Sequence, residues 1–167
     1  MKRLLLATSA LAAILAVGTT SANARNTAAV YQFGYHNSGS FVQKGHFNRG
    51  TLRTAGYSNY SRAVQAGRWN YLYQQQLGSR SQALTDQYGD SNYAVTGQQG
   101  SRNAAATYQT GRSNISGIAQ IGTNHRALTE QSGVSNTAAV IQLGNGQNAE
   151  MHQVGDGNVS VIIQGGD

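Results

Sequence analysis

The chain has 167 residues, including 21 glycines but no cysteine or proline, and its formal net charge is +6 although only 11% of its residues are charged. The lack of cysteine excludes disulfides and thiol chemistry. A hydrophobic content of 39%, with few large aliphatic residues beyond residue 17, excludes an ordinary globular core. Low charge and absent proline argue against disorder, because disordered chains are usually rich in both whereas stacked β-structures avoid them.

Residues 1–24 have the pattern of a secretory signal peptide. Lys2 and Arg3 form a positive head, an apolar stretch runs from Leu4 to Val17, and Ala22-Asn23-Ala24 is a small-x-small cleavage site. An N-terminal membrane anchor is the alternative, but the apolar stretch is shorter than the roughly 20 residues that a spanning helix needs. We therefore expect a secreted mature chain that begins near Arg25 and is not transmembrane.

From Asn26 onward the chain consists of thirteen rows of eleven residues, with the consensus Asn-x-small-x-β-branched-x-Gln-x-Gly-x-x. The ninth position is always glycine, the seventh is glutamine except at Thr54, and the first is asparagine in ten rows. The glycines, which we expect to form turns, are Gly34, Gly45, Gly56, Gly67, Gly78, Gly89, Gly100, Gly111, Gly122, Gly133, Gly144, Gly155 and Gly166. Such self-similarity is the signature of a solenoid or stacked array.

The structural unit is expected to contain 22 residues, in two similar but inequivalent halves. Ser81, His125 and Gln147 replace asparagine at the first position, and all three stand in alternate rows. The intervening rows keep asparagine without exception. Residues 25–167 then form a single repeat domain of about six and a half units.

Each row is expected to form a β-strand of about seven residues, followed by a turn at Gly-x-x. Conserved and variable positions alternate with the period of two that is typical of strands. Every charged residue of the mature chain lies at an even position or in the expected turn, so the odd positions are expected to face inward. The sequence therefore predicts an all-β solenoid of stacked strand-turn-strand units, spaced by about 4.8 Å.

Amide side chains that repeat at one position can form hydrogen-bonded ladders along such a stack, because each amide both donates and accepts. The expected ladder residues are Asn26, Gln32, Gln43, Asn48, Gln65, Asn70, Gln76, Gln87, Asn92, Gln98, Gln109, Asn114, Gln120, Gln131, Asn136, Gln142, Gln153, Asn158 and Gln164. The repeat begins within two residues of the predicted mature start and continues to within a residue of Asp167, so we expect no capping segment. Uncapped terminal strands favour self-assembly into an amyloid fibre.

The repeat resembles that of the curlin family, the subunits of extracellular amyloid fibres called curli. The family pattern Ser-x5-Gln-x4-Asn-x5-Gln occurs as Ser81, Gln87, Asn92 and Gln98, and most other units have asparagine in place of the serine. The resemblance covers essentially the whole mature chain. It implies a pilus-like fibre at the surface of a Gram-negative bacterium, for adhesion and biofilm formation.

The resemblance also implies partners: other curlin subunits, an outer-membrane secretion pore and periplasmic chaperones. Curli contain a major subunit and a minor nucleator. Family major subunits are acidic and carry a Gly/Asn-rich leader that this chain lacks, whereas the basic balance and the Gln-x-Gly-x-x-Asn-x-Ala pattern are similar to the nucleator.

Other functions are less well supported by the sequence. An enzyme is not expected, because no nucleophile, base and orienting group occur at a plausible spacing, and we expect no cofactor. The four histidines are too far apart in sequence to predict a metal site. A soluble secreted β-solenoid that binds ice, polysaccharide or nucleic acid remains the alternative, although the even positions show no regular threonine column and no nucleic-acid motif.

The charged residues are unevenly distributed. Residues 25–80 contain seven basic and no acidic residues, whereas residues 81–167 contain three basic and six acidic residues. One interpretation is a solvated outer face that keeps the chain soluble. The other is that oppositely charged ends favour head-to-tail addition, or that the basic half contacts an anionic surface or DNA.

Overall fold

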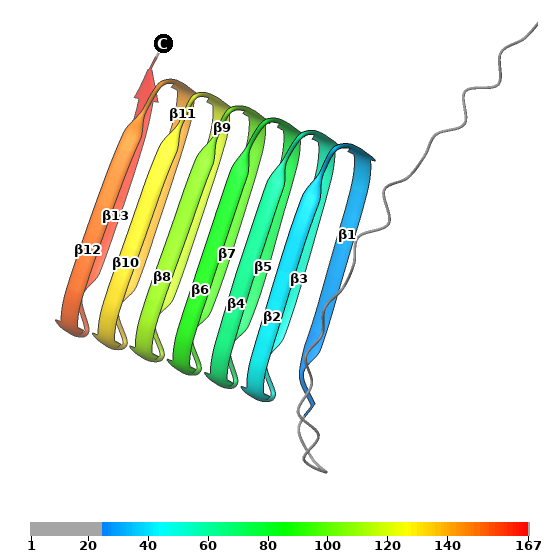
Figure 1. The fold of residues 1–167 in the computed structure, drawn as a ribbon. Coiled ribbons are helices and arrows are strands. Elements are labelled where there is room, and N and C mark those ends of the chain that lie inside the picture. Colours follow the sequence, from blue (N-terminus) through cyan, green and yellow to red (C-terminus); the bar gives the residue numbers. More distant parts are fainter. Residues whose placement is uncertain (1–24, 167) are drawn as a thin grey trace, which may run out of the picture.

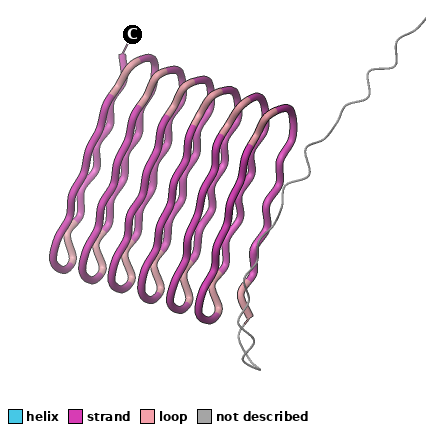
Figure 2. The backbone as a smooth tube through the Cα atoms, viewed as in Figure 1, coloured by secondary structure: helices cyan, strands magenta, loops and turns pink. Residues whose placement is uncertain are grey.

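The computed structural model describes residues 25–166, and the predicted signal peptide lies outside these residues. Thirteen strands, one for each row, account for nearly all of the described chain (Figure 2). The strands are β1 (Thr27–Tyr35), β2 (Ser38–His46), β3 (Arg49–Tyr57), β4 (Tyr60–Arg68), β5 (Tyr71–Ser79), β6 (Gln82–Asp90), β7 (Tyr93–Ser101), β8 (Ala104–Arg112), β9 (Ile115–Thr123), β10 (Arg126–Val134), β11 (Thr137–Asn145), β12 (Asn148–Asp156) and β13 (Val159–Gly166). No helix among the described residues is long and apolar enough to span a membrane.

The strands form two sheets in which all neighbouring strands are parallel. Within each sheet the strands follow one another along a single axis in sequence order (Figure 1). Sheet A contains the seven odd-numbered strands and sheet B the six even-numbered strands. Each strand pairs with the strand two places along the chain, in a register that sets every residue beside the one 22 positions away. This architecture confirms the predicted all-β solenoid of 22-residue units, each made of two eleven-residue halves.

The strands are longer than predicted. Twelve of them have nine residues and β13 has eight, because the ladder continues through the ninth-position glycine to the residue after it. The turn contains only the last residue of one row and the first residue of the next. Its last-position residue has positive φ even where it is not glycine, as at Trp69 with φ of 62° and Arg80 with φ of 55°. The glycines therefore precede the turn, which corrects the expected Gly-x-x turn.

The interior is narrow and largely polar. The buried apolar side chains are mostly small, such as Ala63 and Ala94, with Leu52 and Leu72 among the largest. Most of the remaining buried residues are glutamine, asparagine, threonine and serine at odd positions of the rows. Burial of so many amides requires that nearly every one finds hydrogen-bond partners.

Candidate functional site

Two glutamine ladders run through the interior, one along each sheet. In sheet B, each side-chain amide donates from Nε2 to Oε1 of the glutamine 22 residues later, at 2.7–2.9 Å, from Gln43 to Gln153. In sheet A, the same contact measures 2.8–2.9 Å from Gln76 to Gln164. The ladder residues of sheet B are Gln43, Gln65, Gln87, Gln109, Gln131 and Gln153, and those of sheet A are Gln76, Gln98, Gln120, Gln142 and Gln164.

The same glutamines also bridge the two sheets. The second Nε2–H of each ladder amide donates to a backbone carbonyl 16 residues earlier, in the opposite sheet. Gln43 contacts the carbonyl of Thr27 at 3.0 Å, and Gln87 contacts that of Tyr71 at 2.9 Å. A glutamine within the ladder thus has hydrogen-bond partners for both N–H groups and for Oε1, as Gln87 does, which explains how it can be buried. The sequence pattern did not predict these contacts with carbonyl groups.

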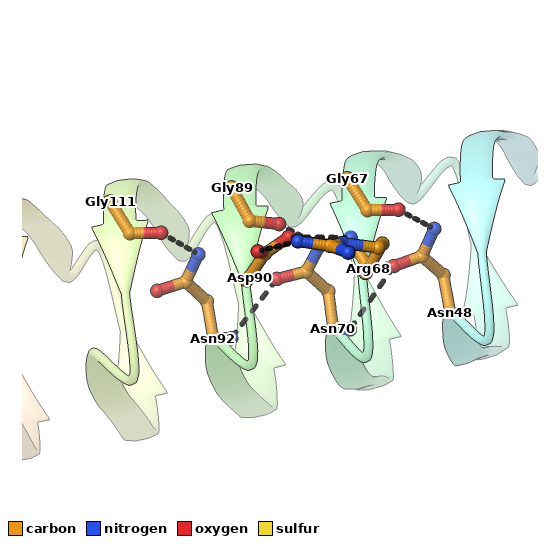
Figure 3. A network of polar contacts seen from close by, with 8 residues as sticks. All are labelled: Asn48, Gly67, Arg68, Asn70, Gly89, Asp90, Asn92 and Gly111. Carbon is orange, nitrogen blue, oxygen red and sulfur yellow. Dashed lines mark hydrogen bonds and ion pairs between the residues drawn. The ribbon is translucent and has the colours of Figure 1, made fainter.

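The first-position asparagines form a second type of ladder at the turns (Figure 3). The Oδ1 of Asn48 accepts the backbone N–H of Asn70 at 3.1 Å, and the Oδ1 of Asn70 accepts that of Asn92 at 3.0 Å. The side-chain Nδ2 of Asn48 donates to the carbonyl of Gly67 at 3.0 Å. The same pattern continues through Asn114, Asn136 and Asn158. Asparagine therefore joins successive units and fixes the turn.

Two of the three residues that replace asparagine at the other turn, Ser81 and His125, keep the acceptor role, whereas Oε1 of Gln147 has no hydrogen-bond partner within the described chain. Ser81 accepts the backbone N–H of Asn103 through Oγ at 3.3 Å. His125 accepts the N–H of Gln147 through Nδ1 at 3.3 Å, while its Nε2 lies 3.2 Å from the carbonyl oxygen of Ile121. The backbone N–H of Gln147 can only donate, so Nδ1 is the acceptor of this contact and Nε2 is the ring nitrogen that faces the carbonyl. His125 thus replaces a ladder amide and is not placed to bind a metal.

Thr54 interrupts the ladder of sheet A. Its Oγ1 lies 3.5 Å from Oε1 of Gln76, but its side chain is too short to reach Gln32. The Nε2 of Gln32 is consequently buried without a hydrogen-bond partner. The prediction that Gln32 belongs to the hydrogen-bonded ladder is therefore wrong, although the residue lies at the ladder position.

A small polar cluster crosses the interior around Gln74, which stands at the fifth position, where the consensus has a β-branched residue. The Nε2 of Gln74 donates to Ser61 Oγ at 2.8 Å and to the carbonyl of Ala83 at 2.7 Å. Its Oε1 accepts the hydroxyl of Thr85 at 3.1 Å. The sequence analysis missed this cluster, and only the departure of Gln74 from the fifth-position pattern could have indicated it.

The ninth-position glycines allow the units to stack closely. A Cβ added to Gly100 would overlap the carbonyl oxygen of Gly122 in the next unit, and the same holds from Gly34 to Gly144. At the end of the stack, Gly155 and Gly166 have no such neighbour within the described chain. These glycines are therefore required by contact between units as well as by their positive φ.

Charged side chains form ion pairs along the outer surface. Arg68 lies 2.8 Å from Asp90, and its hydrogen bond holds the pKa of that carboxyl below its ordinary value. His152 lies between two carboxylates, 2.7 Å from Glu150 and 2.8 Å from Glu130. The hydrogen bond to Glu150, assisted by that to Glu130, raises the pKa of His152. Within residues 25–166, no group of three or more His, Cys, Asp or Glu side chains is placed so that it could hold a metal ion.

Both ends of the stack expose strand edges. In the described chain, β1 and β2 at one end and β12 and β13 at the other pair with a neighbour on one side only. The glutamine ladders reach the edges at β2, β12 and β13, whereas the ladder of sheet A stops at β5, two strands short of the β1 edge. The asparagine ladders begin at Asn26 and Asn37, beside β1 and β2. Such edges are templates for pairing with another strand, so the ladder ends are the candidate functional site.

The fold and the ladders define a parallel, two-sheet β-solenoid of the repeat-protein class. Comparison of the chain with known protein families, with characterised proteins and with solved structures finds no match. The fold is compatible with a structural repeat subunit. A more specific function has to be inferred from the chain's own residues.

Proposed function

We propose that the protein is a secreted structural subunit that polymerises end to end into curli-type extracellular amyloid fibres. The observation that carries this proposal is the presence of unpaired strand edges and unsatisfied ladder ends at both ends of the described solenoid. A self-complementary edge adds a second copy by the same contacts that stack the units within one chain.

The ladder polarity supports addition in one direction. Every ladder glutamine donates from Nε2 toward higher residue numbers, so Gln153 and Gln164 end the stack with a donor that lacks its ladder acceptor. At the opposite end, Oε1 of Gln43 has no ladder donor within the described residues. The donor end of one copy is therefore complementary to the acceptor end of the next.

The curlin-like repeat also supports a proposal for how the chain is exported and what the fibre does. The signal-peptide pattern of residues 1–24 favours export. Passage through an outer-membrane pore, handling by periplasmic chaperones, and a role in adhesion and biofilm then follow from the resemblance. The basic balance favours the nucleator over the major subunit.

Assembly from denaturant tests the proposal. Residues 25–167 would be diluted from guanidinium, and thioflavin fluorescence and circular dichroism would be followed with and without preformed seeds. We expect conversion to β-structure after a lag that seeding abolishes, with a fibre-diffraction spacing of about 4.8 Å along the axis. A soluble, β-rich monomer that never elongates would contradict the proposal and favour a binding module.

Ladder variants give a sharper test in the same assay. Gln43→Ala and Gln153→Ala remove ladder amides next to the open edges, whereas Tyr60→Ala and Arg62→Ala alter outward side chains of an inner strand. We expect the glutamine variants to slow seeded elongation at least tenfold more than the controls, because each loses two side-chain hydrogen bonds that the stack needs. Equal slowing by all four variants would contradict the role of the ladder in assembly.

A further inference from the structure

The outer face of sheet A carries no charge over most of its length. On β5, β7, β9, β11 and β13, the side chains at the outward, even positions are all uncharged. Within the described part of sheet A, Arg49 and Arg53 of β3 are the only charged outward residues. The outer face of sheet B differs, because charged residues such as Lys44, Arg62, Glu130 and Glu150 are distributed along it.

Toward the C-terminal end, this face of sheet A is also strongly apolar, and we call it the apolar face. It consists of the outward residues of β7, β9, β11 and β13. Its exposed large side chains are Tyr93, Ile115, Ile121, Ile141, Leu143, Val159, Val161 and Ile163, which are 37–71% exposed. Contiguous apolar surface of this kind usually marks an interaction site.

The apolar face has a hollow beside a ridge. Gly97 of β7 and Ala119 of β9 help to form the floor of a hollow of about 180 Å³, and an added Cβ at Gly97 would meet no atom within 4 Å. The ridge lies on the two following strands of the sheet, where Ile141 of β11 and Ile163 of β13 are 37% and 68% exposed. All four residues stand at the sixth position of their rows, and therefore at the same height along the strands.

We propose that this face binds the same face of a second copy of the chain, through a two-fold axis that runs parallel to the strands between β9 and β11. This axis sets β9 of one copy opposite β11 of the other, and β7 opposite β13. Ile141 then lies over Ala119 of the partner, and Ile163 lies over its Gly97. Each copy fills the other's hollow with its ridge, as an isologous interface requires.

The other simple symmetry packs less well. A two-fold axis along the solenoid would set each strand opposite its own copy with reversed direction, so Gly97 and Ala119 could face only residues of β7 and β9. Ile141 and Ile163 would then not reach the hollow of the partner, and the van der Waals contact between ridge and hollow would be lost. Only the axis parallel to the strands sets Ile141 over Ala119 and Ile163 over Gly97.

The absence of charged residues on the apolar face also favours a second copy of the chain as the partner. Bringing two identical faces together creates no like-charge contact and buries no ionised group. The four strands cover on the order of 500 Å² on each copy at the usual strand spacing and rise, which is on the order of 1,000 Å² in total and the lower end of specific interfaces. Isolated copies should pair weakly, whereas repetition along a fibre would make lateral pairing stable.

Fibre mass per unit length tests the pairing without depending on elongation rates. We expect wild-type fibres to contain two solenoids, and fibres of Ile141→Lys to have half that mass per length while their assembly kinetics stay the same. Tyr108→Lys is the matched control, because Tyr108 is 36% exposed on sheet B and Ile141 is 37% exposed. Equal mass per length in wild type and Ile141→Lys would overturn the proposal.

A size exchange tests the proposed axis. Ile141→Ala should separate the paired solenoids, and adding Ala119→Ile to it should restore pairing, because each copy supplies both residues of the contact. Failure of the double variant to restore pairing would exclude this geometry. Anionic lipid vesicles are a second probe: if Ile141→Lys lost vesicle binding but kept the wild-type mass per length, the face would bind lipid and the proposal would be wrong.

The pairing can be tested even if the chain forms no fibres, in which case the proposed function fails by itself. Sedimentation equilibrium of the soluble chain at concentrations up to several hundred micromolar would then be measured. A concentration-dependent dimer that Ile141→Lys abolishes and Tyr108→Lys keeps would support the pairing. A monomer at all concentrations would overturn it.

Discussion

At the scale of single residues, the stability of the interior depends on hydrogen bonds between a side chain and the same type of side chain in the next unit. A glutamine in an ordinary core would be costly, because one or more of its polar atoms would lack partners. Here the neighbours in the stack supply those partners at 2.7–2.9 Å. The energetic benefit of each amide therefore depends on the residue 22 positions away.

Thr54 allows this dependence to be measured. We predict that Thr54→Gln raises the free energy of unfolding by about 1 kcal/mol, because it gives the buried Nε2 of Gln32 an acceptor and extends the ladder to Gln76. Urea denaturation followed by circular dichroism would measure the change. Thr54→Glu is the control of equal shape, and it should destabilise the chain because a buried carboxylate cannot donate. Stabilisation by both substitutions would mean that side-chain volume alone matters.

At the scale of the strand and its turn, the glycine column determines how closely the units approach. Gly100 and Gly97 lie on the same strand, but only Gly100 faces the carbonyl of the glycine in the next unit. Gly100 also has φ of 114°, which a residue with a side chain rarely adopts. The two glycines therefore form a matched pair within β7.

We predict that Gly100→Ala lowers the free energy of unfolding by at least 3 kcal/mol, since the added methyl group forces the backbones of neighbouring units apart. Gly97→Ala should be neutral or stabilising by up to about 1 kcal/mol, because its Cβ is unobstructed and alanine restricts the unfolded chain more than glycine does. Urea denaturation of the two variants would provide the comparison. If Gly100→Ala changed the free energy of unfolding as little as Gly97→Ala does, the stack would tolerate a side chain at Gly100.

Contacts between neighbouring strands also predict a pH dependence. His152 of β12 is held between Glu150 and Glu130, and these hydrogen bonds raise its pKa above the ordinary value of 6.5. Because the folded pKa exceeds the unfolded one, the stabilisation is complete below pH 6.5 and is lost as the pH rises through the folded pKa. We predict that the urea midpoint falls between pH 6 and pH 8, and that His152→Gln removes this part of the pH dependence. His46→Gln, which alters an exposed histidine of β2, should leave it unchanged, and an equal effect of the two variants would assign the dependence elsewhere.

The sequence predicts the elements well where a feature recurs in every row. The eleven-residue period follows from the glycine and glutamine positions, the 22-residue unit from the alternate rows that replace asparagine, and the inward odd positions from the placement of the charges. The position of the turn does not, because positive φ at Trp69 and Arg80 depends on contacts between neighbouring units, including those of the next residues, Asn70 and Ser81. The cluster around Gln74 and the unpaired amide of Gln32 depend on single exceptions, whose outcome is set by packing. The apolar face is hidden in the sequence because consecutive rows belong to opposite sheets.

At the scale of the whole molecule, sequence order becomes spatial order along the stack (Figure 1). The uneven charges of the sequence are therefore separated in space. Lys44, Arg49 and Arg53 lie near the β1 end, whereas Glu150 and Asp156 lie on β12 at the other end. Head-to-tail addition would bring the basic end of one copy to the acidic end of another.

This separation predicts that salt slows elongation. Opposite charges at the joining ends attract over roughly a Debye length, about 10 Å at 0.1 M salt and 3 Å at 1 M, and such steering raises association rates. We expect the seeded elongation rate to fall severalfold between 0.02 and 0.5 M sodium chloride. Glu150→Gln should reduce that dependence, whereas Arg102→Gln, at the turn after β7 in the middle of the stack, should leave it nearly unchanged. A rate that rises with salt for all three chains would indicate that net positive charge governs association, and that the charges serve to keep separate copies apart.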